Sequence, residues 1–259
     1  MILFICPNKS YILIFSIKNM KRKGQVTIFI IIAVVIIAFA GVFFAFKDNF
    51  SFDSSNPEIA PISNFVQECV YNTGFNGLYF LASSSGYFDI PENSDETGVA
   101  YYLIENKKYI PSKEIISKEL DKYLEITLPT CVGNFSEFSE FNITKEEIIS
   151  SSEIRDNEII LNVNYPLTIK KDNSYYRLSK FNNVKINLRY GQIYSIANEI
   201  VDSVDGQNLC TSCLAEISEE YNVKIDIRTT ESEVLFYISD KSTFGFEPYF
   251  KFIFAVKNE

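Results

Sequence analysis

An uninterrupted apolar segment lies near the N-terminus, from Val26 to Phe46. Its 21 residues carry no charge, and Thr27 is the one polar interruption. As a helix this segment would rise roughly 30 Å, which matches the hydrocarbon core of a bilayer. A buried core helix is the alternative, but such a helix rarely stays apolar on every face over this length. The pattern therefore predicts a single transmembrane helix over residues 26–46.

A helical period of apolar residues begins at Ile62. Apolar side chains at positions 62, 65, 66, 69 and 70 follow the spacing of one face of an amphipathic helix, which we expect to continue to Leu81. A second apolar stripe follows Ser112, a residue type that caps helices, and is expected to stop near Pro129. The residues between the two stripes predict a small β element.

Beyond about residue 145 the hydrophobic period changes from 3.6 to 2. Apolar and polar residues alternate over residues 159–165 and 184–190, and residues 171–174 form a turn sequence. Two helical stretches and three strands are expected after these, at residues 194–204, 209–221, 223–227, 233–239 and 248–257. Because short turns join most of the strands, we expect an antiparallel sheet. The predicted fold class is α+β, with a single N-terminal transmembrane helix followed by an exported domain that has an antiparallel sheet and packed helices.

Charge divides the chain at the end of the apolar segment. All 33 acidic residues lie from Asp48 onward, whereas six of the 24 basic residues precede it, so the remainder carries a net charge of −15. Basic residues before the segment and acidic residues after it place the N-terminus in the cytoplasm and the chain after about residue 47 outside the cell. We therefore predict a single-pass protein of the cell membrane. An exported part this acidic repels phosphate backbones, which makes nucleic acid a poor candidate partner.

The expected organisation of the chain has five parts. A cytoplasmic basic stub precedes the membrane segment, and a tether rich in Asp, Asn, Ser and Pro follows it. The parts are residues 1–25 for the stub, 26–46 for the membrane segment, 47–61 for the tether, 62–144 for a helix-rich part of the exported domain and 145–259 for a β-rich part. We expect translation to begin at Met20, so that residues 1–19 take no part in the fold.

Residues 21–27 read KRKGQVT, and together with the apolar segment they resemble an archaeal class III signal peptide. This signal is found on archaeal pilins and archaellins. The resemblance implies cleavage after Gly24, which leaves Gln25 as the mature N-terminus. Many pilins carry glutamate at the fifth mature position, where this chain has Phe29, and Pro57 argues against a helix that continues into the domain. We therefore expect processing without assembly into a stable filament.

The chain contains no histidine and five cysteines. The lack of histidine removes the commonest general base, the commonest zinc ligand and every Ser-His or Cys-His catalytic pair. Four of the cysteines lie in the exported part, where an even number indicates disulfides, and they are Cys69, Cys131, Cys210 and Cys213. Three pairings are open. The local spacing favours Cys210 with Cys213, which leaves Cys69 for Cys131.

Cys210 and Cys213 also have the CxxC spacing of a redox site, near an expected helix start where a thiolate is favoured. The alternatives are a structural disulfide, a disulfide oxidoreductase and a zinc site. The zinc site would need all four cysteines because no histidine is present. No βαβ unit precedes the motif, so we favour the structural disulfide and predict neither a cofactor nor a metal.

Two further signals are common in chains of this composition. Asn49, Asn134 and Asn142 begin N-x-S/T sequons, which are glycan acceptors on an exported face. The adjacent carboxylates Glu146–Glu147 and Glu219–Glu220 have the chemistry of an acid and a base. With 33 acidic residues in the chain, a solvated surface is the simpler interpretation of these pairs.

Two functions remain open at the level of the sequence. The first is a membrane-anchored, non-enzymatic surface protein, whose exported domain binds a protein partner or assists an envelope or pilus-like assembly. The second is an anchored extracellular enzyme, either a thiol oxidoreductase that uses the CxxC or a carboxylate-dependent hydrolase. A pocket that holds perturbed titratable groups would favour the enzyme, whereas an exposed patch or sheet edge would favour the binding protein. The sequence identifies no catalytic residue and no small-molecule ligand.

Overall fold

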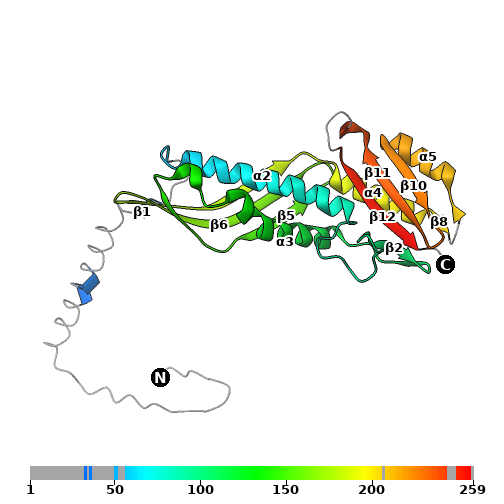
Figure 1. The fold of residues 1–259 in the computed structure, drawn as a ribbon, viewed down its shortest axis with the longest axis horizontal. Helices are drawn as coiled ribbons and strands as arrows, with labels where there is room; N and C mark the ends of the chain where they lie inside the picture. Colours follow the sequence, from blue (N-terminus) through cyan, green and yellow to red (C-terminus); the bar gives the residue numbers. More distant parts are fainter. Residues whose placement is uncertain are drawn as a thin grey trace, which may run out of the picture. The chain divides into compact units, whose positions relative to one another are not determined.

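The computed structural model describes residues 56–205, 208–243 and 249–257, together with residues 32, 33, 35 and 36 and the backbone of residues 50–51. The chain divides into two compact units, Met1–Asn49 and Phe50–Glu259. In the first unit, residues 32, 33, 35 and 36 are helical. The described part of the second unit contains four α-helices and two five-stranded sheets (Figure 1).

The predicted fold class is wrong in two respects. Within the ranges given above, no helix combines the length and the apolar character that a membrane crossing requires. The helix expected over residues 26–46 lies outside these ranges, apart from residues 32, 33, 35 and 36. In addition, the strands form two mixed sheets instead of one antiparallel sheet, because each five-stranded sheet contains a parallel pair. The observed class is therefore a mixed α/β fold.

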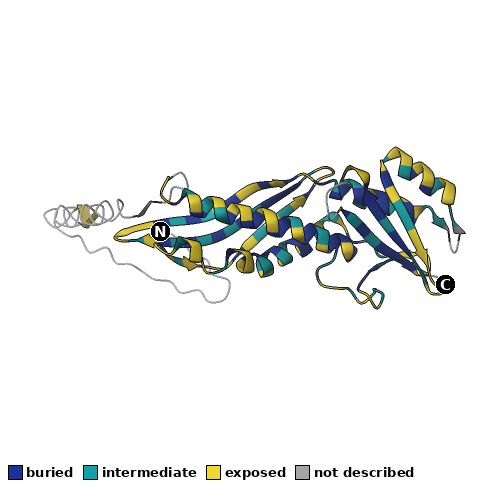
Figure 2. Ribbon diagram, turned by 45° about the horizontal axis from the view of Figure 1, so that its top comes forward, coloured by how far each residue is buried: buried dark blue, intermediate teal, exposed yellow. Residues whose placement is uncertain are grey.

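The first sheet is built on a long β-hairpin. Its strands β6 (Ile159–Lys171) and β7 (Ser174–Ile186) are antiparallel, and Asp172 takes a left-handed φ of 51° in the turn between them. β4 (Asn142–Lys145) and β5 (Ile149–Ile154) pair with successive stretches of the other edge of β6. β1 (Phe50–Ser51) runs parallel to β7. From residue 161 to 169, the odd-numbered residues of β6 are buried and the even-numbered ones are half-buried (Figure 2).

Two long helices, α2 (Ala60–Ser83) and α3 (Lys113–Val132), pack beside each other along the first sheet (Figure 1). Glycine brings α2 close to its neighbours: a Cβ at Gly74 would lie 2.3 Å from a methyl of Leu161 in β6. The Ser112 hydroxyl accepts the backbone N–H of Ile115 and caps α3. α3 continues through Pro129 and ends before a Gly133 whose φ is +55°.

α3 also covers the outer edge of β5. The hydroxyls of Ser150 and Ser152 donate to the backbone oxygens of Asp121 and Ser117, each over 3.0 Å. The N–H of Ser150 donates to Oε1 of Glu125 over 2.9 Å. An edge strand with free backbone groups would offer a template for pairing with other chains, and these contacts remove that hazard at β5. Burial in the same seam raises the pKa of Asp121.

The second sheet combines strands that lie far apart in the sequence. β10 (Val223–Thr229), β11 (Glu233–Asp240) and β12 (Lys251–Lys257) form an antiparallel meander. β2 (Tyr101–Ile104) then pairs in parallel with β12, and β3 (Lys107–Lys108) follows as the edge. This sheet therefore joins residues near 101 with strands that follow residue 222.

The helices α4 (Tyr190–Asp202) and α5 (Thr211–Glu220) cover one face of the second sheet. We call this face the inner face. The short strands β8 (Val204–Asp205) and β9 (Asn208–Leu209) lie between these helices in sequence, and the 3₁₀ turns η1 (Ser136–Phe138) and η2 (Lys241–Thr243) complete the described elements. The inner face is strongly aromatic, and its buried rings are Tyr102, Tyr190, Phe236, Phe250, Phe252 and Phe254. These rings and the buried side of the first sheet belong to one hydrophobic core.

Candidate functional site

The disulfide Cys69–Cys131 joins the two long helices. Cys69 is 3% exposed on the buried side of α2, and Cys131 lies in the last turn of α3, with a Cα–Cα distance of 5.7 Å. The bond links residues 62 positions apart, for which loop-closure entropy gives a stabilisation of roughly 4 kcal/mol. This disulfide is therefore placed to hold α2 against α3.

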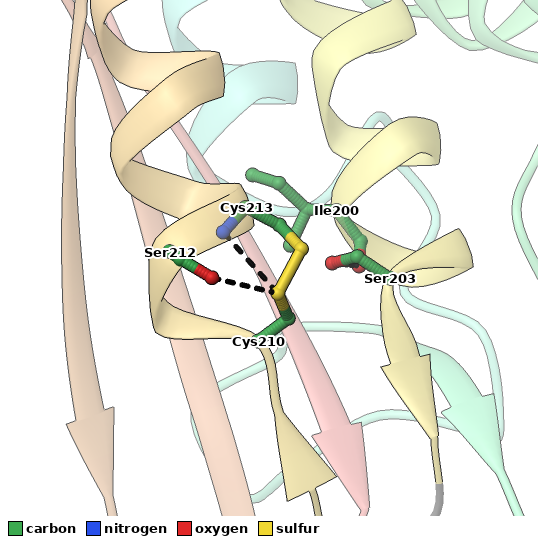
Figure 3. Close-up of a disulfide and its surroundings, with 5 residues drawn as sticks. All are labelled: Ile200, Ser203, Cys210, Ser212 and Cys213. Carbon is green, nitrogen blue, oxygen red and sulfur yellow. Dashed lines mark hydrogen bonds between the residues drawn. A yellow bond between two sulfur atoms is a disulfide. The ribbon is translucent and has the colours of Figure 1, made fainter.

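The disulfide Cys210–Cys213 lies within one helical turn (Figure 3). Cys210 is the N-cap residue of α5, and its sulfur accepts the backbone N–H of Cys213 over 3.2 Å. The Ser212 hydroxyl lies 3.4 Å from the same sulfur. Ile200 and Ser203, at the end of α4, face the disulfide from the other side (Figure 3). Both cysteines are half-buried, and the two bonds together are the pairs that the local spacing favoured.

The other residues singled out from the sequence do not meet the disulfides. Asn134 and Asn142 are exposed, the first directly after Gly133 and the second at the start of β4, so both sequons are accessible. Asn49, Gly24 and Gln25 lie outside the described residues.

The adjacent carboxylates lie at the surface. Glu146 and Glu147 are exposed, and Glu146 pairs with Arg177 over 3.1 Å, while Glu219 and Glu220 are exposed at the end of α5. No cluster of three or more potential metal ligands occurs in the described part of the chain. Neither pair lies in the buried surroundings that would be needed to make one carboxyl an acid and the other a base.

The outer face of the second sheet, opposite α4 and α5, carries a groove of ≈ 390 Å³. We call it the outer-face groove. Its floor is apolar and comes from a loop and two strands, with Val99, Leu235, Tyr237 and Ile253 as its members. Its rim is polar, and the rim residues are Ser83, Asp95, Thr97, Arg228, Thr230 and Glu233. An apolar floor inside a polar rim is the usual composition of a binding site.

Both carboxylates of the rim are engaged within the protein. Asp95 Oδ1 accepts the N–H groups of Thr97 and Val99, each over 2.8 Å, which fixes the loop beside the sheet. Glu233 Oε2 accepts the hydroxyl of Tyr101 over 2.6 Å. Burial, reinforced by this carboxylate, raises the pKa of Tyr101 and keeps its phenol protonated at neutral pH.

Arg228 is the charged group of the rim that remains available. It is exposed on β10, and no carboxylate of the described ranges lies within ion-pair distance of it. The three other arginines of these ranges all have acidic partners, and they are Arg155, Arg177 and Arg189. Because an arginine presents five N–H donors in a fixed plane, an unpaired one beside an apolar floor suits a carboxylate ligand.

Lysines surround the groove on the same face. The amine of Lys251 lies 5.9 Å from the ring centre of Tyr237 and 5.2 Å from that of Tyr249, and Lys257 lies 5.8 Å from the ring centre of Tyr101. The strand register places Lys224, Arg228, Lys251 and Lys257 on this face together with Asp226 and Glu233. Lys224 pairs with Asp226 over 2.8 Å, and Asp95 lies on the loop beside the groove. The strands of this face therefore carry more cations than carboxylates, whereas the domain as a whole is strongly acidic.

The local sequence pattern does not reveal this surface. The alternation in β10 and β12 does place charged residues on one side, for example Lys224, Asp226 and Arg228. The contribution of Val99 and Tyr101, more than 120 residues earlier, has no local signal. The pairing of β2 with β12 brings them there.

Fold and site together define a disulfide-bonded mixed α/β domain with an open groove on one sheet, whose rim carries Arg228 and two carboxylates. Comparisons of the chain with protein-family models, with curated proteins and with solved structures each found no match.

Proposed function

We propose that residues 50–259 form an exported interaction domain at the outer surface of the cell membrane. Its outer-face groove binds an acidic polypeptide segment of a partner protein. The observation that carries this proposal is Arg228, which has no acidic partner among the described residues and lies beside an apolar floor, on strands that carry more cations than carboxylates. A partner carboxylate on Arg228 and a neighbouring apolar side chain on the floor would satisfy both parts of the groove.

The distribution of charge favours a partner with several carboxylates. The four cations of the outer face lie on two strands, β10 and β12, and they are more than one small anion would engage. Opposite potentials steer encounter and help to reject wrong partners, so the acidic remainder of the domain would repel the same segment elsewhere.

The tyrosine rings favour a polypeptide over an acidic polysaccharide. Sugars commonly stack on exposed aromatic faces, but Lys251 and Lys257 already lie over the rings of Tyr237, Tyr249 and Tyr101. The apolar floor at Leu235 is 6% exposed and suits an aliphatic side chain better than a sugar hydroxyl.

A labelled acidic peptide tests the groove. We expect a fluorescein-labelled (Glu-Val)₃ peptide to bind saturably in fluorescence anisotropy, and (Lys-Val)₃ not to bind. Arg228→Glu should weaken binding of the acidic peptide by at least about tenfold, because it removes a charge-assisted hydrogen bond and adds a repulsive carboxylate. Arg228 is exposed and unpaired, so its replacement should leave the fold intact.

Arg177→Glu is the matched control for this experiment. It makes the same change of charge on the first sheet, where Arg177 pairs with the exposed Glu146. An equal loss of binding in this variant would mean general electrostatic attraction and not recognition by the groove. The absence of peptide binding, or tight binding of polygalacturonate in its place, would also contradict the proposed partner.

Export is supported by cysteine usage and by the charge division of the sequence. Two disulfides persist best outside the reducing cytoplasm. We expect the full chain to sediment with membranes, external protease to digest the region after residue 48, and N-terminal sequencing to begin at Gln25. Gly24→Leu is the control for processing. Recovery of full-length protein in the soluble cytosolic fraction would refute this location.

A further inference from the structure

We infer that Cys210–Cys213 is a thiol–disulfide exchange site whose substrates are cysteine pairs of other proteins. This inference goes beyond the proposed binding function and does not depend on the outer-face groove. Its starting point is the contrast between the two disulfides. Cys69–Cys131 connects two separate helices, with Cys69 buried and Cys131 exposed, whereas Cys210 and Cys213 lie in the same half-buried turn and connect no separate elements.

α5 keeps its place without the bond. Its buried residues Leu214 and Ile217 pack into the main core, and the Ser218 hydroxyl donates to the backbone oxygen of Val223 in β10 over 2.7 Å. Ile217 and Ser218 lie at least one turn beyond the cysteines, and Leu214 directly follows Cys213. Opening of the disulfide therefore leaves the helix and the sheet behind it packed.

The first turn of α5 stabilises an anionic sulfur at Cys210. Cys210 is the N-cap residue, so its sulfur lies at the positive end of a ten-residue helix. The N–H of Cys213 already points at this sulfur over 3.2 Å, and the first turn contains no acidic residue that would oppose a negative charge. A helix N-terminus of this kind makes the N-terminal cysteine of a CxxC pair a good leaving group and a good nucleophile.

Access to the sulfurs comes from the side of Ser212. Thr211 and Ser212 are exposed, whereas Ile200 and Ser203 cover the opposite side of the disulfide (Figure 3). A partner cysteine can therefore approach the pair along one direction, over two small hydroxyl side chains.

The exchange begins when a thiolate of the partner attacks Sγ of Cys210. The bond between Cys210 and Cys213 breaks, and its electron pair goes to Sγ of Cys213, which takes a proton from water. The second thiolate of the partner then attacks the partner sulfur of the mixed disulfide, and Cys210 leaves as a thiolate. The partner loses two electrons and gains a disulfide, while Cys210–Cys213 becomes a dithiol. A low-molecular-weight disulfide, such as glutathione disulfide, reoxidises the pair by the same exchange.

Reduction of the folded full chain by dithiothreitol tests the inference, with Cys69–Cys131 as the internal control. The thiols are alkylated at each concentration and identified by peptide mapping. We expect half-reduction of Cys210–Cys213 at a dithiothreitol concentration at least about tenfold lower than for Cys69–Cys131. Reduction of both pairs at the same concentration, or of Cys69–Cys131 first, would overturn the inference.

A second measurement separates an exchange site from a merely exposed disulfide. Cys213→Ser leaves Cys210 as a thiol, and Cys210→Ser leaves Cys213, while both variants keep Cys69–Cys131. With glutathione disulfide at pH 7, we expect the thiol of Cys210 to form a mixed disulfide at least about tenfold faster than that of Cys213. Equal rates would show that the helix N-terminus does not activate Cys210. The reduction experiment uses the unmodified chain, so it stands even where a variant misfolds.

Discussion

Joint replacement of Cys69 and Cys131 by alanine should lower the free energy of unfolding by about 4 kcal/mol, the loop-closure entropy of a link between residues 62 positions apart. For a domain of this size, a loss of that magnitude corresponds to a fall in Tm of roughly 10 °C. Chemical denaturation and calorimetry of the oxidised proteins measure both quantities. Alanine is preferred to serine because Cys69 is buried, where a hydroxyl without a partner would add its own cost.

The matched control is the double alanine variant of Cys210 and Cys213. This bond links residues only three positions apart, and the same entropy relation gives about 2 kcal/mol for it. We therefore expect the loss at Cys69–Cys131 to be about twice as large. A smaller loss at Cys69–Cys131 than at Cys210–Cys213 would show that packing alone, without the cross-link, holds α2 against α3.

Replacement of Arg189 by leucine should cost about 3 to 5 kcal/mol, because it leaves a buried carboxylate without its cation. Asp240 is 1% exposed at the end of β11, and Nε of Arg189 donates to its Oδ2 over 3.0 Å. Nη2 of Arg189 donates to Oδ1 of the same carboxylate. Nη1 of Arg189 donates to the backbone oxygen of Tyr221, so the side chain ties the start of α4 to the second sheet.

Arg155→Leu is the matched control for this substitution. Arg155 also pairs with carboxylates, those of Glu153 and Glu158, but at the surface, where such pairs contribute about 0 to 1 kcal/mol. The double variant Arg189→Leu with Asp240→Leu should recover much of the loss, since it removes both charges. Equal losses in Arg155→Leu and Arg189→Leu would contradict this account of the pair.

The same ion pair predicts how stability changes with pH. Burial by itself would raise the pKa of Asp240, but hydrogen bonds from Arg189 and Ser242 outweigh it and hold the pKa below its ordinary value. A carboxyl with a lowered folded pKa contributes stability that is present above its unfolded pKa of about 3.9 and is lost as the pH falls through the folded pKa. In Arg189→Leu the carboxyl of Asp240 loses the donors that lower its pKa most, so it takes up a proton at a higher pH than in the native protein. The stability difference between the native protein and Arg189→Leu should therefore be largest where this carboxyl is ionised in both proteins and shrink as the pH falls.

Local structure in this protein follows closely from local sequence. The 3.6-residue period after Ile62 corresponds to α2, and the capping serine at 112 corresponds to the start of α3. The alternation over residues 159–165 belongs to β6, and the turn sequence at 171–174 closes the hairpin with β7. These features depend on neighbours within a few residues, where backbone geometry and side-chain period act directly.

One helix boundary differs from the prediction. The sequence predicts that the second helix stops near Pro129, yet α3 runs on to Val132. A proline removes only its own N–H, and this one lies in the last turn, so the helix loses a single hydrogen bond there. Gly133, with its left-handed φ, is the residue that follows the helix end.

The sequence by itself determined which stretches are helix or strand, which of their faces are apolar, the division of charge at Asp48 and the local spacing of Cys210 and Cys213. The tertiary structure alone decided which strands are neighbours, that there are two sheets, and that the pair β2 and β12 is parallel. The period of a strand records which side is buried but not its partner, because partners are chosen by contacts between residues far apart in the chain. The outer-face groove and its unpaired Arg228 follow from that choice, and so no local pattern could contain them.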